Sequence, residues 1–261
     1  MTSQLHLQAE GEVATLTIDR VEKRNALSLE MWNRIPGIIA EIEKDASVRV
    51  LVIRGVDSSA FASGVDIDEF SRIAASEELG WQLMDTVHAA EQSIANCVKP
   101  VIAMIEGYCV GGGVELALAC DLRFASRKST FAVPPAKLGL VYSLSSTRRL
   151  VELIGIGKTR DLLYSARSFD ASEAQEIGLV ERIFDPEEIV DATLSYARTL
   201  CSRSQYSIRA SKKIIAAVSR GAVVPDAEIQ RLRGGSFAAD DLKEGMAAFF
   251  EKRAPKFTWN Q

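Results

Sequence analysis

The chain has 261 residues, 47% of them apolar and 25% charged, so it is long enough to bury roughly 70 to 75% of its unfolded surface in one large domain. Its 31 basic and 35 acidic side chains give a net charge of -4, which argues against nucleic acid as the main partner. The four cysteines form no CxxC pair, the first 25 residues lack an apolar signal core, and no apolar run reaches the roughly 20 residues that span a bilayer. We therefore expect a cytoplasmic protein that binds neither nucleic acid nor membrane.

The first part of the chain alternates between strand and helix patterns. In chain order these are a hairpin over 5–17, a helix capped by Ser28 that Pro36 and Gly37 should kink or restart, a strand over 48–54, a helix over 77–96, a strand over 101–105, strands over 121–125 and 179–184, and helices over 171–177 and 187–201. This alternation is typical of α/β layering.

Beyond residue 202 the pattern is helical only. Gly234 and Gly235 predict a break in it, and residues 240–253 predict a final amphipathic helix. We therefore expect an α/β core over 1–200 and a helical C-terminal region over 201–261.

Three consecutive glycines, Gly111 to Gly113, follow the strand over 101–105 and open an apolar helical segment. Glycines at this place leave bare N–H groups at the positive end of a helix, which is an anion-binding geometry. Glu115 is the one carboxylate on this segment, so it should point into a pocket or the core. The alternative is a tight turn whose glutamate merely complements the helix dipole.

A second loop, over 61–70, joins small residues to the start of another helical segment. If its exposed N–H group converged with one from the glycine run, the two would form an oxyanion hole, in which each donor is worth roughly 2.7 to 4 kcal/mol. A purely structural turn explains this loop equally well. The only histidines, His6 and His88, lack the spacing of a metal site or a nucleophile and base pair, so no metal site is expected and proton transfer would fall to carboxylates, tyrosine or water.

Several segments of the chain resemble those of a known family and occur in the same order. The residues over 19–27, both glycine loops and the segment over 244–253 are similar to the enoyl-CoA hydratase/isomerase, or crotonase, superfamily over nearly the whole chain. The resemblance implies a spiral of ββα units and a helical C-terminal region that builds homotrimers, often paired into hexamers.

It also implies a coenzyme A thioester as substrate, with no separate cofactor, whose carbonyl is polarised by the backbone N–H groups of Ser63 and Gly112. Glu115 matches the first of the two glutamates that activate water in the hydratases. The positions that match the coenzyme A site are Arg24, Ala26, Gly64, Val65, Asp66, Ile67 and Lys256, the last reaching a phosphate from a neighbouring subunit.

One position departs from the hydratase pattern. Pro135 stands where the second glutamate is expected, and proline can neither donate nor accept a side-chain proton, so ordinary hydratase activity should be weak or absent. Tyr142 resembles a tyrosine of the methylmalonyl-CoA decarboxylase branch, although that branch has a histidine where this chain has Val65. The alternative is that Tyr142 only lines the acyl pocket.

These observations favour an enzyme that acts on a CoA thioester through an enolate, with Glu115 as the leading acid/base and Tyr142 as a second group. Isomerisation or atypical hydration of an enoyl-CoA ranks first, decarboxylation of a methylmalonyl-type CoA ester second, and CoA ester hydrolysis third. A CoA-binding protein without turnover is the rival from another class. Burial would raise the pKa of Glu115 and the helix end would lower it, and the sequence leaves that balance open.

Overall fold

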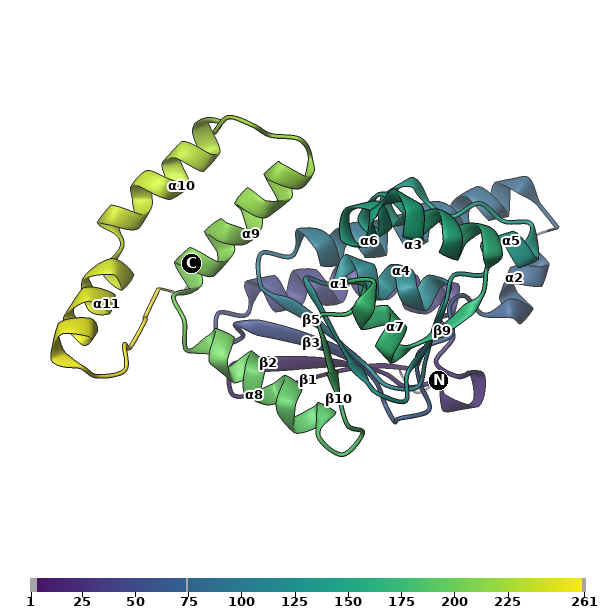
Figure 1. Cartoon of the computed structure of the whole chain (residues 1–261), viewed down its shortest axis with the longest axis horizontal. Coiled ribbons are helices and arrows are strands. Elements are labelled where there is room, and N and C mark those ends of the chain that lie inside the picture. The colour runs from purple at the N-terminus through teal and green to yellow at the C-terminus, as the bar shows by residue number, and fades with distance from the viewer. Residues whose placement is uncertain (1–3, 74, 260–261) are drawn as a thin grey trace.

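The computed structural model describes residues 4–73 and 75–259, which fold into two sheets covered by helices, with a helical arm projecting from one side (Figure 1). The larger sheet has the strand order β1-β2-β3-β5-β7-β10, and the smaller one has the order β4-β6-β8-β9. The strands of the larger sheet are β1 (Leu5–Glu10), β2 (Val13–Ile18), β3 (Val50–Gly55), β5 (Val101–Ile105), β7 (Leu122–Ser126) and β10 (Arg182–Phe184). Those of the smaller sheet are β4 (Ala60–Ala62), β6 (Tyr108–Val110), β8 (Thr130–Ala132) and β9 (Ser168–Asp170).

A strand pair followed by a helix repeats three times along the chain. Each of the pairs β3-β4, β5-β6 and β7-β8 places its first strand in the larger sheet and its second in the smaller one, and equivalent strands pair in parallel. The helices that follow these pairs are α2 (Ile67–Ile73) with α3 (Glu77–Asn96), then α4 (Gly112–Ala119), then α5 (Pro135–Leu138) with α6 (Leu144–Ser165). The predicted spiral of ββα units is confirmed.

The larger sheet separates two apolar cores. Because alternate side chains of a strand face opposite sides, Leu51 and Ile53 of β3 join the main core under α1 (Leu29–Lys44), whereas Val50 and Val52 pack on α8 (Ile189–Cys201). The main core fixes the helices that carry the candidate site. Short elements complete the chain, namely the 3-10 helix Val21–Lys23 and α7 (Ala171–Glu176).

The first helix differs from its prediction in one respect. The Ser28 hydroxyl caps it as expected, accepting a hydrogen bond from the Met31 amide at 3.2 Å. Pro36 does not restart it, because α1 continues through this residue. Proline removes only one backbone donor, and the fully buried side chains of Trp32 and Ile39 hold the turns on either side of it against the core.

The arm consists of α9 (Gln205–Ser219), α10 (Ala227–Ala238) and α11 (Asp240–Glu251), and it leads away from both sheets (Figure 1). The break predicted at Gly234 and Gly235 is wrong, since α10 runs through both residues and ends at Ala238. Gly235 instead makes room for a neighbour: a Cβ there would lie 2.5 Å from the hydroxyl oxygen of Tyr206, which donates to the Leu232 carbonyl at 2.6 Å. The glycine thus allows α9 and α10 to pack closely.

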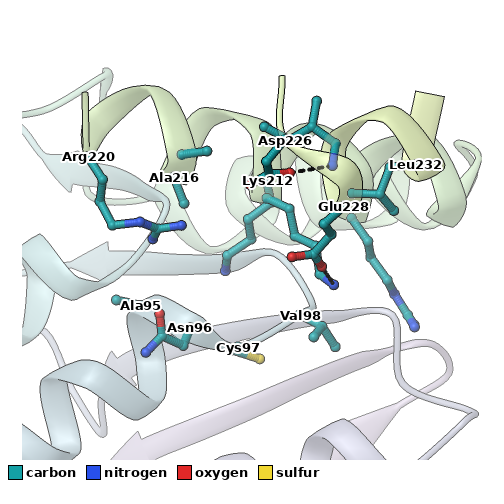
Figure 2. A pocket seen from close by; sticks show the side chains of 14 residues that line it. Ala95, Asn96, Cys97, Val98, Lys212, Ala216, Arg220, Asp226, Glu228 and Leu232 are labelled. Carbon is teal, nitrogen blue, oxygen red and sulfur yellow. Dashed lines mark hydrogen bonds and ion pairs between the residues drawn. The ribbon is translucent and has the colours of Figure 1, made fainter. Parts of the chain in front are cut away.

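A polar cleft separates the arm from the end of α3 (Figure 2). Lys212 of α9 crosses to the core, where its Nζ donates to the Lys99 carbonyl at 3.0 Å and pairs with Asp121 at 2.7 Å. Lys213 remains within the arm and pairs with Glu228 of α10. Neither glycine loop lines this cleft. The contacts of Lys212 across it anchor the arm to the core. No helix in the described ranges combines the length and apolar character that crossing a membrane requires.

The two glycine loops meet at the junction of β4 and α4. A Cβ on Gly113 would overlap the carbonyl oxygen of Ala62, and a Cβ on Gly112 would lie 3.3 Å from the Cα of Gly64. Backbone therefore packs directly on backbone here, and only glycine permits it.

Gly113→Ala should lower the free energy of unfolding by about 1–3 kcal/mol, because the added methyl group forces β4 and α4 apart. Gly80→Ala is the matched control, since Gly80 lies in α3 with open space around its Cβ position, and it should be neutral or stabilising by up to about 1 kcal/mol. Urea unfolding of both variants measures the difference. Equal stabilities for the two variants would contradict the contact described for Gly113.

Candidate active site

The backbone amide of Ser63, which the family resemblance assigns to the oxyanion hole, makes a hydrogen bond within the protein. Ser63 donates its backbone N–H to the Arg24 carbonyl at 3.1 Å, and its hydroxyl donates to the Lys23 carbonyl at 3.1 Å. Both groups tie the loop to the segment before α1. The structure therefore does not leave the Ser63 amide free for the role expected of it.

The next residues of this loop pair with Leu27. The Leu27 amide donates to the Gly64 carbonyl at 2.7 Å, and the Asp66 amide donates to the Leu27 carbonyl at 3.1 Å. In a parallel bridge of this kind, the residue between the two pairing partners directs its own amide to the other side. That residue is Val65, whose N–H has no acceptor among the residues that the structure describes.

The second loop ends in the first turn of α4. Gly111 has a φ of 54°, a conformation that favours glycine, and Gly112 begins the helix. The Gly112 amide has no acceptor in the described ranges, as expected for the first residue of a helix. Since Gly64 and Gly112 are in backbone contact, the free amides of Val65 and Gly112 come from adjoining segments.

Glu115 lies in the first turn of α4 and is half-buried. Burial raises the pKa of its carboxyl to about 8, and the negative charge of Glu91 adds to this rise. Hydrogen bonds from the hydroxyl and main chain of Ser143 and the positive charge of Arg149 oppose it. Burial thus outweighs these opposing effects, and the carboxyl is mostly protonated at pH 7.

Tyr142 lies close to Glu115. Its hydroxyl donates to the Gly111 carbonyl at 3.4 Å, and its ring packs against the main core. Burial and the neighbouring carboxylates of Glu115 and Glu91 hold the pKa of this phenol well above its ordinary value. The structure therefore places a neutral hydroxyl group beside Glu115.

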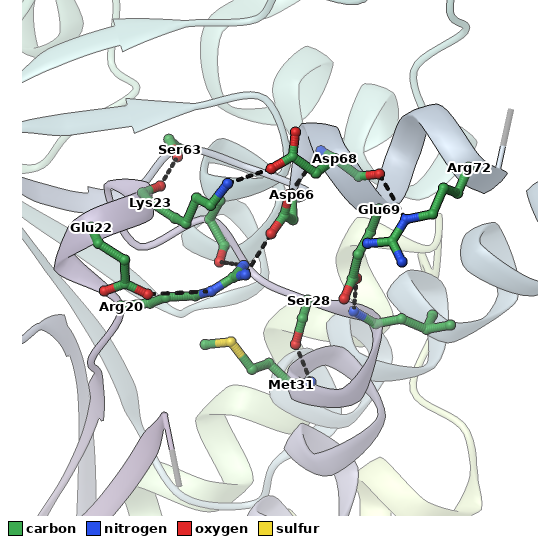
Figure 3. Close-up of polar contacts among 12 residues, drawn as sticks. Arg20, Glu22, Lys23, Ser28, Met31, Ser63, Asp66, Asp68, Glu69 and Arg72 are labelled. Carbon is green, nitrogen blue, oxygen red and sulfur yellow. Dashed lines mark hydrogen bonds and ion pairs between the residues drawn. The ribbon is translucent and has the colours of Figure 1, made fainter. Parts of the chain in front are cut away.

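The Asp66 side chain is occupied in holding the first loop together (Figure 3). Its buried carboxylate pairs with Arg20 at 2.5 Å and accepts a hydrogen bond from the Asp68 amide at 2.8 Å. Lys23 pairs with the Asp68 carboxylate. Its main chain is also used, since the Asp66 amide donates to the Leu27 carbonyl and the Asp66 carbonyl accepts from the Phe70 amide at 2.8 Å.

The other residues matched to the coenzyme A site are spread over two parts of the molecule. Arg24 is exposed and lies over the ring of Tyr108, with 5.0 Å between its guanidinium carbon and the ring centroid. Ala26 is buried, and Ile67 is exposed at the start of α2. Lys256 is exposed beyond α11, in the arm.

Glu91, which lies on α3 with no exposed surface, is not among the residues predicted from the sequence. Arg149 and Ser145 each donate a hydrogen bond to its Oε2 at 2.9 Å. Glu91 falls four residues after Val87 on the apolar face of α3, so a charge on that face was the available signal. Pro135, in contrast, opens α5 and contributes no titratable group.

The histidines lie apart from the glycine loops. The Nε2 of His6 lies 3.1 Å from a carboxylate oxygen of Asp19, and His88 is exposed on α3 with its Nδ1 3.5 Å from the Ser145 hydroxyl. In the described part of the chain, no group of three or more His, Cys, Asp or Glu side chains is arranged to hold a metal ion.

The raised pKa of Glu115 predicts a stability that depends on pH. The unfolded carboxyl ionises near pH 4.5 and the folded one near pH 8, so its contribution to stability is complete below pH 4.5 and is lost as the pH rises through 8. Glu115→Gln cannot ionise and should gain stability over the parent between pH 5 and pH 8.5, as measured by urea unfolding. Glu41→Gln, an exposed substitution on α1, should show no such gain. The same difference between parent and Glu115→Gln at both pH values would contradict the raised pKa.

Comparison with known proteins shows which family the chain belongs to. A model of the enoyl-CoA hydratase/isomerase family matches residues 8–260. A solved structure of an enoyl-CoA hydratase/isomerase family protein from Hyphomonas neptunium is 42% identical, with a TM-score of 0.96 and 99% of each chain covered. The crotonyl-CoA hydratase of Syntrophomonas wolfei is 34% identical, covering 96% of each chain, and the short-chain-enoyl-CoA hydratase of Clostridium acetobutylicum is 32% identical, covering 95% of this chain and 94% of the relative. The chain belongs to the enoyl-CoA hydratase/isomerase family.

Proposed function

We propose that this protein binds an enoyl-CoA thioester and that the amides of Val65 and Gly112 hold its carbonyl oxygen while that oxygen becomes anionic. The observation that carries the proposal is that the amides of Val65 and Gly112 have no acceptor among the described residues and come from two loops in backbone contact. Two preorganised N–H donors stabilise an enolate more than a ground-state carbonyl, so they accelerate its formation. The names of the relatives from Syntrophomonas wolfei and Clostridium acetobutylicum support the same class of substrate.

Glu115 is the group proposed to move the proton. As a carboxylate it removes a proton from the α carbon of a 3-enoyl thioester, and the electron pair of that C–H bond moves into the dienolate. The same carboxyl then returns the proton at the γ carbon, which leaves the double bond between the α and β carbons. No co-reactant is needed, and one acid/base suffices, in keeping with Pro135 at the start of α5.

Atypical hydration by Glu115 alone belongs to the same proposal. Addition of water to a 2-enoyl thioester requires activation of the water and a proton for the α carbon. Glu115 would have to fill both roles. With Pro135 in place of a second carboxylate, this reaction should be slower than isomerisation.

The neutral phenol of Tyr142 beside Glu115 favours a second candidate, decarboxylation of a methylmalonyl-type CoA ester. Here the bond to the carboxylate breaks and carbon dioxide leaves. The electron pair moves to the thioester oxygen held by the two amides, and Glu115 or Tyr142 then donates a proton to the α carbon. This reaction requires either Glu115 or the phenol of Tyr142 in its protonated form.

The two candidates predict opposite pH profiles. Isomerisation by a carboxylate should show kcat/KM rising about tenfold per pH unit and levelling above pH 8, whereas decarboxylation that depends on protonated Glu115 should fall above that pH. Assays with 3-enoyl-, 2-enoyl- and methylmalonyl-CoA esters measure this. Glu115→Gln should lower kcat by about 10²- to 10⁴-fold. If the variant equals the parent on every accepted substrate, or if the parent binds CoA esters without converting any, the proposal is wrong.

We further propose that the chain assembles into trimers, singly or paired into hexamers, through its arm. The arm exposes large apolar side chains that a monomer would leave in water, namely Ile215, Val218, Val224, Phe237, Met246, Phe249 and Phe250. Apolar surface of this extent is typical of subunit interfaces. In such an assembly, Lys256 of one subunit would reach the phosphate end of a ligand bound to another.

Sedimentation at micromolar concentration should give three or six times the 28.5 kDa mass of the chain. Phe249→Asp should shift the distribution towards smaller species, because it places a charge in the buried interface. Lys243→Asp, an exposed substitution on the same helix, should leave the distribution unchanged. A parent protein that sediments as a monomer would contradict the assembly.

A further inference from the structure

A buried ion pair lies behind the candidate acid/base. Glu91 of α3 is fully buried, and Arg149 of α6 donates to its Oε2 at 2.9 Å. The Ser145 hydroxyl donates to the same oxygen at 2.9 Å. The other carboxylate oxygen, Oε1, has no hydrogen-bond partner among the described residues. Glu91 is thus firmly held through one oxygen and unsatisfied at the other.

Hydrogen bonds connect this pair to Glu115. The Ser145 and Ser143 hydroxyl oxygens lie 3.2 Å apart, and hydrogen bonding by the hydroxyl and main chain of Ser143 lowers the pKa of the Glu115 carboxyl. Ser143 is also the N-cap of α6, where its hydroxyl accepts from the Ser146 amide at 3.1 Å. A continuous chain of polar contacts therefore links α3, the start of α6 and α4.

Stability alone does not account for Glu91. Replacing a buried ion pair by apolar residues of similar volume is often neutral or stabilising, and an unsatisfied buried acceptor is itself unfavourable. The surrounding face of α3 is apolar, with Leu83, Val87 and Ile94 buried in the main core. Unfavourable buried charge beside a candidate acid/base is typical of functional sites.

We propose that Glu91 is a positioning residue for Glu115: fixed by Arg149, it orients the Glu115 carboxyl through Ser145 and Ser143 and keeps a second negative charge beside it. Glu91 does not contact the substrate in this arrangement. The inference rests on the proposed function of Glu115 as the acid/base, but its physical content is the coupling between two carboxyl groups, which can be measured without turnover.

The groups around the two carboxyls define the expected effect. Glu115 faces Glu91 from α3, Arg149 from α6 and Tyr142 from the segment before α6. Glu91 has His88 on its own helix, linked through the Ser145 hydroxyl. Of the charges acting on the Glu115 carboxyl, Glu91 raises its pKa more than Arg149 lowers it. Removing the charge of Glu91 should therefore favour the ionised form of Glu115.

Infrared titration of the protonated carboxyl band tests this directly. The band that disappears in Glu115→Gln is assigned to Glu115. The pH midpoint of its titration is then measured in the parent and in Glu91→Gln. The midpoint should fall by about one pH unit or more in Glu91→Gln, because the amide keeps the shape and removes the charge. Glu181→Gln is the matched control, as Glu181 also pairs with a buried arginine, Arg123, but away from Glu115, and it should leave the midpoint unchanged.

A second variant covers the case in which Glu91→Gln fails to fold because Arg149 is left unpaired. The double variant Glu91→Gln with Arg149→Met removes both charges and should still lower the midpoint, by less than the single change. An unchanged or raised midpoint in the variants that fold would overturn the proposal. If the parent converts no CoA ester, the proposed function fails while the titration still decides the coupling.

Discussion

The direct contact between two stretches of backbone, at the start of α4 and after β4, is the constraint on which this site depends. Gly113 packs on the Ala62 carbonyl and Gly112 on Gly64, so no side chain separates the two loops. The loops belong to successive ββα units, and the parallel pairing of β4 with β6 brings them together. A repeating fold thereby creates a local arrangement in which amides from distant parts of the sequence are adjacent and unused.

The position of Glu115, the candidate acid/base, depends on the same fold. The first turn of α4 directs Glu115 towards α3 and α6, where burial and the charge of Glu91 together raise its pKa to about 8. A carboxyl with such a pKa exchanges protons near neutral pH, which suits one group that both removes and returns a proton. The Gly112 amide and the Glu115 carboxyl thus both belong to the first turn of one short helix.

Much of the fold and part of the site could be predicted from the sequence, because strand and helix alternation and the glycine run are local signals. Whether an amide is free depends on residues far away in the sequence. The Ser63 amide donates to a carbonyl 39 residues earlier in the chain, and the Val65 amide is free because the residues on either side of it pair with Leu27. The sequence of α3 marks Glu91 as a charge on an apolar face, but its ion pair with Arg149 comes from another helix and is not local. The glycine at position 235 makes room for Tyr206 of another helix, a contact that composition does not reveal.

The proposed function requires two main-chain donors that polarise a bound thioester. The most direct test is the carbonyl stretching frequency of a CoA thioester carrying ¹³C at that carbon, measured by difference infrared spectroscopy in complex with the protein. Two hydrogen bonds from Val65 and Gly112 predict a shift to lower frequency than in water. A bound ligand whose carbonyl absorbs at the same or a higher frequency than in water would contradict the account.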